Sequence, residues 1–69
     1  MHRQPVDSSN LRSVGYDAAT KTLEVEFRSG AVYQYSGVDE ETFNRFMASP
    51  SKGKFLYRSV RAVHTGRRA

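Results

Sequence analysis

Residues 22–35 of the chain read TLEVEFRSGAVYQY and predict a β-hairpin. In the first half of this stretch, Leu23, Val25 and Phe27 alternate with polar residues, which is the pattern of a half-buried antiparallel strand. A serine–glycine pair then supplies the turn, and the chain runs back through a second strand as far as Tyr35. The domain is therefore expected to form around an antiparallel sheet with one buried face.

Two turn geometries are compatible with this hairpin, and they place its tyrosines differently. A type I turn with Gly30 in the left-handed region and a bulge would pair Phe27 with Ala31. Tyr33 and Tyr35 would then share the face of the apolar residues of the first strand. A two-residue turn would instead put both tyrosines on the opposite face. We favour the first geometry because it collects more apolar surface on one side of the sheet.

A further strand precedes the hairpin. Residues 10–16 predict this strand, although Leu11, Val14 and Tyr16 do not keep a period of two. A bulge near Gly15 would reconcile their spacing with one buried face. The three strands would form an antiparallel meander.

The first helix is predicted to follow the hairpin. Asp39 can cap its free amides, and Pro50 ends it. Phe43, Phe46 and Met47 form an i, i+3, i+4 stripe, which is typical of a helix side that packs on a core.

A second helix is predicted from Lys52 to about Ala62, with Ser51 as its cap. On a helical wheel one arc is apolar and contains Phe55, Leu56, Val60 and Val63. The far side of the wheel is basic and contains Lys54, Arg58 and Arg61. The helix is therefore expected to bury one side and to present cations on the other.

Three strands followed by two helices predict an α+β domain in which both helices pack on one face of the sheet. The chain has 69 residues, which is too short for two domains. We expect residues 1–9 to form a flexible N-terminal arm, residues 10–64 the single domain, and residues 65–69 a flexible basic tail.

Charge is divided unevenly along the chain. The net charge is +4, but residues 1–41 carry −3, whereas residues 42–69 carry +7 and no acidic residue. Such a one-sign segment attracts anions such as phosphates, or else forms a solvated surface. The chain has no cysteine and no apolar run long enough to cross a membrane. A cytoplasmic protein without a membrane partner is the expectation.

The residue pattern predicts no enzyme. His2 and His64 lie at or near the loose ends, without an assigned acid or nucleophile beside them. Glu24 and Glu26 share one side of a strand, where solvated positions opposite the core account for both. We expect no catalytic residue, no metal site and no cofactor.

The candidate binding residues lie at and along the second helix. Free amides at its start, together with nearby lysines, could hold a phosphate, or the segment could be a capped helix start whose lysines point to water. Tyr57 lies between the apolar and basic arcs and is the aromatic residue best placed to stack on a base. The predicted site therefore consists of Ser51, Lys52, Gly53, Lys54, Tyr57, Arg58 and Arg61.

The order of several short motifs resembles the KTSC domain family, named for its place at the C-terminus of some lysyl-tRNA synthetases and found also as short bacterial and phage proteins. The motifs that carry the resemblance are Ser8-Ser9, Gly15-Tyr16-Asp17, Leu23-x-Val25-x-Phe27-x-x-Gly30, Val32-Tyr33-Gln34-Tyr35, Gly37-Val38, Ser51-Lys52-Gly53 with Phe55, and Val60-Arg61. The resemblance covers residues 7–64 and implies no established activity, although RNA binding has been suggested for the family. This chain has Tyr57 where the family has Asn, and 63–65 where it has Tyr-Pro.

Two classes of function are compatible with these features. The first is a small non-catalytic module that binds nucleic acid, with RNA favoured over DNA, through the basic second helix. The alternative is a module that binds another protein or a phosphorylated small ligand, as a phage-type accessory factor or inhibitor would, and that self-associates as a homodimer. General nucleic-acid binding falls steeply with salt, whereas a pocket for one nucleotide responds to that ligand alone.

Overall fold

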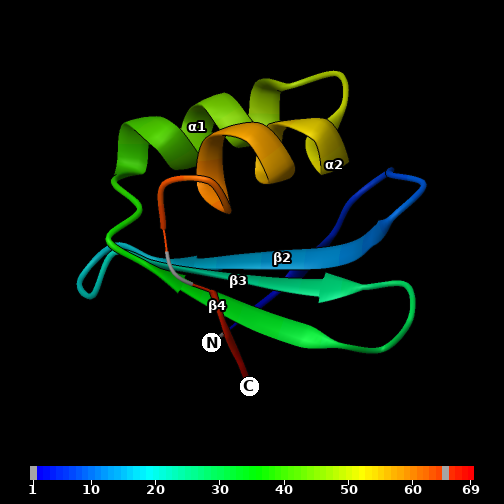
Figure 1. Cartoon of the computed structure of the whole chain (residues 1–69), viewed down its shortest axis with the longest axis horizontal. Helices are drawn as coiled ribbons and strands as arrows, with labels where there is room; N and C mark the ends of the chain where they lie inside the picture. Colours follow the sequence, from blue (N-terminus) through cyan, green and yellow to red (C-terminus); the bar gives the residue numbers. More distant parts are fainter. Residues whose placement is uncertain (1, 65) are drawn as a thin grey trace.

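An antiparallel sheet of five strands and two helical segments make up the computed structural model of the chain, which describes residues 2–64 and 66–69 (Figure 1). The strands lie in the order β1-β2-β3-β4-β5, so each pairs with the next strand along the chain. The elements in chain order are β1 (Gln4–Pro5), β2 (Leu11–Asp17), β3 (Thr22–Phe27), β4 (Val32–Ser36), α1 (Glu40–Ala48), α2 (Lys52–Phe55), η1 (Leu56–Val60) and β5 (Gly66–Arg68). We call α2 and η1 together the second helix.

Both helices cover the same face of the sheet (Figure 1). The core between the two layers consists of Leu11, Val14, Leu23, Val25, Tyr35, Val38, Phe46, Leu56 and Val60. At its edge, the Phe43 ring of α1 stacks on Tyr16 of β2, with centroids 4.5 Å apart. The predicted α+β class is confirmed.

The sheet has more strands than the predicted meander of three, because each end of the chain adds a short edge strand. Gln4 pairs with Val14 on one side, and Arg68 pairs with Tyr33 on the other. These strands lie in the segments assigned to an arm and a tail, whose first residues, 1 and 65, are outside the described residues. Segments of two or three residues are too short to show an alternating pattern, so the pairing of these strands could not be predicted from the sequence.

The hairpin turn has the geometry that we favoured. Gly30 adopts a φ of 97° and donates its N–H to the Phe27 carbonyl (2.9 Å). The Phe27 N–H in turn donates to the Ala31 carbonyl (2.8 Å). Tyr33 and Tyr35 consequently pair with the valine and leucine of β3 and lie on the inner face of the sheet, as predicted.

The bulge in β2 lies nearer the start of the strand than predicted. The register with β3 shifts between Leu11 and Ser13, so Leu11 and Val14 both reach the core. Gly15 pairs regularly with Glu24 and is not part of the bulge. A glycine is required there for a different reason, which is the close approach of the N-terminal segment. A Cβ atom there would lie 2.6 Å from the His2 carbonyl oxygen, so the N-terminal segment passes directly over this glycine.

The predicted first helix is confirmed. Asp39 caps α1 by accepting a hydrogen bond from the Thr42 N–H (2.8 Å). Phe46 is fully buried, and Phe43 and Met47 pack beside it at the edge of the core. The helix ends at Ala48, just before the serine–proline pair.

The second helix differs from the predicted α-helix in two respects, namely the cap at its start and the helix type and length after Phe55. Ser51 makes no side-chain capping hydrogen bond. After Phe55 the helix continues as a π-helix, where the Arg61 N–H donates to the Leu56 carbonyl (2.8 Å). The N–H groups of Val63 and His64 both donate to the carbonyl of residue 60, so a turn replaces the last predicted helical residues.

This turn decides which apolar residues are buried. Leu56 and Val60 are in the core, as predicted, whereas Val63 lies beyond the helix and is 73% exposed. The helical wheel failed at this position because it assumes regular α-helical spacing.

Substituting the hairpin glycine tests the turn. Gly30→Ala is expected to destabilise the fold by about 1–2 kcal/mol, because an L side chain is disfavoured in the left-handed region. No atom lies within 4 Å of the added methyl, so the cost comes from the backbone alone. Urea unfolding measures it, with Ser29→Ala as the neutral control. Equal midpoints for the two variants would contradict the turn geometry.

The helix cap gives a pH-dependent prediction. Hydrogen bonds from Thr42 hold the pKa of Asp39 below its ordinary value of 3.8. The stabilisation is therefore present above that value and is lost as the pH falls through the folded-state pKa. Asp39→Asn also caps but does not titrate, so its thermal unfolding midpoint should fall less than that of the wild type in acid. Parallel acid profiles would contradict the role of the carboxylate.

Candidate nucleic-acid interface

The cations of the second helix lie on its exposed side. Lys54, Arg58 and Arg61 are all exposed, as the helical wheel predicted. Tyr57 is 68% exposed, and the Arg61 guanidinium lies 5.3 Å from the centre of its ring, within range of a cation–π contact. The helix therefore presents an aromatic ring and an arginine side by side.

These cations have no carboxylate partner in the described part of the chain. Over residues 2–64 and 66–69 the one salt bridge joins Arg3 to Glu24 (3.5 Å), on the sheet face away from the helices. The acidic residues of α1 lie in its first turn, where they interact favourably with the positive end of the helix dipole. The positive charge of the second helix is thus not neutralised by a salt bridge within the described residues.

The start of the second helix is less open than its sequence suggests. The Lys52 ammonium donates to the Ser49 carbonyl (3.4 Å), and a Cβ on Gly53 would lie 3.1 Å from the Asn10 amide nitrogen. A recess of about 280 Å³ remains there, lined by Ser51 to Lys54 but also by Asp7. An acid beside the recess and an α-helical segment of four residues weaken the case for a phosphate at this helix start.

A groove separates the second helix from the turn end of the β3–β4 hairpin. It consists of two adjoining cavities of about 560 and 350 Å³, which share Phe27, Ser29 and Arg61 as lining residues. The larger cavity extends over the inner face of β4 towards β5. The smaller one reaches past Arg28 to the residues before β2. We refer to the two cavities together as the groove.

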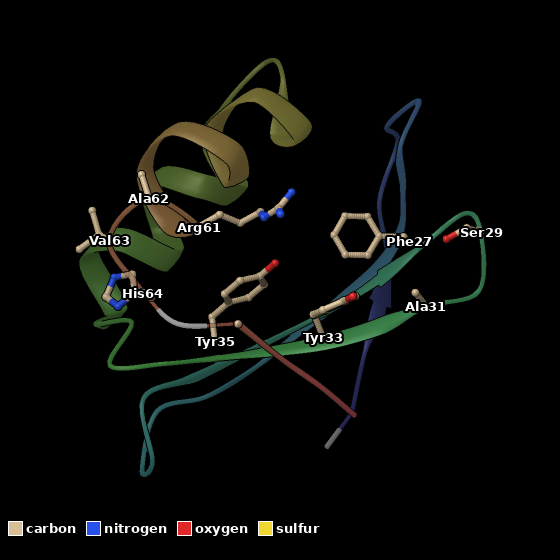
Figure 2. A pocket seen from close by; sticks show the side chains of 10 residues that line it. Phe27, Ser29, Ala31, Tyr33, Tyr35, Arg61, Ala62, Val63 and His64 are labelled. Carbon is tan, nitrogen blue, oxygen red and sulfur yellow. The ribbon is translucent and has the colours of Figure 1, made fainter.

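Aromatic and cationic side chains line the groove. Figure 2 shows Arg61, Phe27 and Tyr35 pointing into the larger cavity from the end of η1, from β3 and from β4. The rings of Phe27 and Tyr33 meet edge to face, with centroids 5.8 Å apart. Arg28 and His64 lie at the two ends, and neither cavity is lined by an Asp or Glu among the described residues.

Tyr35 lines the larger cavity of the groove and is only 2% exposed. Burial raises the pKa of Tyr35, an effect that the nearby Arg61 partly offsets. Strand β5 passes close to this ring, because a Cβ on Gly66 would lie 2.6 Å from the Tyr35 Cε1 atom. The C-terminal edge strand therefore helps to close the groove.

The structure brings only some of the predicted site residues together. Gly53, Tyr57 and Arg61 line the smaller cavity of the groove. The helix start lines the separate recess, and Arg58 lines neither. The groove aromatics were predicted to lie on one sheet face, but nothing local in the sequence indicated that the helices leave part of this face uncovered.

The fold and the groove define a small α+β domain with an open basic surface, and the comparisons place it in a family. The KTSC domain family matches residues 7–63. The crystal structure of a KTSC domain protein from Yersinia pestis is similar, with a TM-score of 0.94 and 40% identity, and the match covers 99% of this chain and 96% of that one. The chain belongs to the KTSC domain family, as the sequence motifs indicated.

Relatives in this family differ greatly in length. An uncharacterized protein of Stutzerimonas stutzeri is 39% identical over 64 residues, which cover 93% of this chain and 90% of that protein. A lysine–tRNA ligase of Trichormus variabilis is 31% identical over 55 residues, which cover 80% of this chain but 10% of the ligase. The domain thus occurs in short proteins and within a much longer enzyme.

Among the described residues, no helix has the length and apolar character needed to span a membrane.

The buried tyrosine gives a prediction at alkaline pH. Since burial raises the folded-state pKa of Tyr35, the stabilisation is present below the ordinary tyrosine value of 10.0 and is lost as the pH rises above it. Tyr35→Phe should therefore lose less stability than the wild type in this range, as measured by urea unfolding. Burial also raises the pKa of Tyr16, which leaves a residual loss in both proteins. Identical alkaline slopes would contradict this account.

Proposed function

We propose that this chain is a small non-catalytic module that binds nucleic acid, RNA in preference to DNA, through the basic second helix. The observation that carries the proposal is the exposure of Lys54, Arg58 and Arg61, none of which has a carboxylate within salt-bridge distance in the described chain. They belong to the segment 42–69, which contains seven cations and no acid. A polyanion is the partner that such a surface attracts most strongly.

The relatives support RNA over DNA. Two lysine–tRNA ligases, enzymes whose names specify tRNA as a substrate, contain a segment similar to this chain. A basic domain within such an enzyme would contribute phosphate contacts to the same substrate. We carry this preference to the present chain as part of the proposal.

Phosphate contacts make the binding dependent on salt. If the three cations of the second helix each neutralise one phosphate of a single strand, log K should fall with log salt at a slope of about −2. Binding of this kind depends little on base sequence.

Charge reversal tests the proposal. Lys54→Glu with Arg58→Glu should lower the affinity for single-stranded RNA by at least about tenfold, because two attractive phosphate contacts become repulsive. Fluorescence polarisation at low and moderate salt measures this, with single-stranded and duplex DNA as comparison probes. The matched control is Lys21→Glu with Arg45→Glu, which makes the same charge change at exposed positions outside the second helix.

The two charge-reversal variants distinguish binding through the second helix from binding that depends on net charge alone. A large loss for the first variant and a small loss for the control would support the second helix as the interface. Equal losses would mean that net charge alone drives binding. No binding by the wild type at low salt would contradict the proposed function.

A second candidate is a module that binds a phosphorylated small ligand, and the observation that favours it is the cavity of about 560 Å³ beside Arg61. That volume lies within the range of small-molecule pockets. A thermal shift produced by one mononucleotide, without binding of any oligonucleotide, would favour this candidate over the first.

A further inference from the structure

We propose that the groove between the second helix and the β3–β4 hairpin receives an unpaired base of a nucleic acid strand, and that the domain therefore recognises single-stranded rather than duplex RNA. This inference rests on the proposed function, which requires only contacts to phosphates. It adds a second element, namely contacts to a base from the hairpin residues that line the groove together with Arg61.

The chemistry of the lining matches a nucleotide. Phe27 and Tyr33 are half-buried, so each keeps part of its ring exposed in the groove. The Arg61 side chain extends into the same space (Figure 2). Arg28 lines the smaller, adjoining cavity. Flat aromatic surface binds a base by stacking, and an arginine beside it binds the attached phosphate or stacks on the base.

The charge of the groove excludes cationic occupants. Arg28 and Arg61 contribute to its lining, and no carboxylate does so in the described chain. An occupant with a flat unsaturated ring and a negative charge satisfies both properties of the lining. A nucleotide unit of a single strand combines them.

The larger cavity is big enough for one base, and the smaller cavity leaves space for the neighbouring nucleotide of the strand. The larger cavity has about 560 Å³, and the smaller one of about 350 Å³ adjoins it past Phe27 and Arg61. A base in a duplex is stacked on both sides, so only an unpaired base can enter such a space. The groove thereby discriminates by strandedness, which the surface cations alone do not.

A peptide is the less suitable occupant. An extended peptide would add to a free strand edge, but β5 already pairs with β4 at Tyr33 and Tyr35, the two paired positions that line the larger cavity. An apolar helix would require an apolar groove, whereas cations lie along this one. Charge and topology together favour the base.

The test compares two probes with equal phosphate content. One is a short oligouridylate, and the other is an oligomer of the same length whose sugars carry no bases. The wild type should bind the base-containing probe at least about fivefold more tightly, because each stacked base adds to the phosphate contacts. A strand with one fluorescent purine analogue should also lose fluorescence on binding, as stacked analogues do.

Two arginines of the second helix provide a matched pair of variants. Both Arg61 and Arg58 are exposed cations, but only Arg61 lines the groove. Arg61→Gln should reduce the preference for the base-containing probe towards unity. Arg58→Gln should weaken binding to both probes by the same factor. Tyr33→Val removes an aromatic ring while keeping a strand-forming residue, and it should also reduce the preference.

Each outcome has a defined meaning. If the wild type binds both probes equally, the inference is overturned while the proposed function stands. If it binds neither probe, both are overturned. If an acidic peptide with aromatic residues displaces the base-containing strand from the wild type but not from Arg61→Gln, and the probes are not discriminated, the groove serves a protein and the inference fails.

Discussion

The left-handed conformation of Gly30 sets the register of the β3–β4 hairpin, and both the core and the groove depend on that register. It pairs Tyr35 with Leu23 and Tyr33 with Val25, so both tyrosines lie on the face that the helices cover. A slip of one residue would move every side chain of β4 to the opposite face. The core would then lose a buried aromatic residue, and the groove would lose its aromatic floor.

One face of the sheet therefore serves two purposes. Beneath the helices it is closed by Phe46, Leu56 and Val60, which fill the core. Towards the turn of the hairpin the same face is open, and the two cavities of the groove lie there between the hairpin and the second helix. The aromatic row thus runs from the core into the groove, where Arg61 stands over it. A stable scaffold and an exposed recognition surface follow from one continuous pattern of side chains.

The charges are separated in space as well as along the chain. The salt bridge between Arg3 and Glu24 lies on the outer face of the sheet, away from the second helix. The cations of the helix and of the groove are thus left without a carboxylate partner in the described residues. Such a distribution costs little stability at the surface and produces a local positive potential. That potential is the physical basis for the proposed binding of a polyanion.

Elements whose contacts are local could be predicted from the order of the residues. The alternation of residues 22–27, the turn glycine and the cap at Asp39 specified β3, its hairpin and α1, because each signal lies within a few residues. The edge strands β1 and β5, the π-helical segment after Phe55 and the groove become apparent only in the folded chain. These features depend on the packing of segments distant in sequence, which no local periodicity records. The basic residues of the site could be predicted, but their relation to the hairpin aromatics required the folded chain.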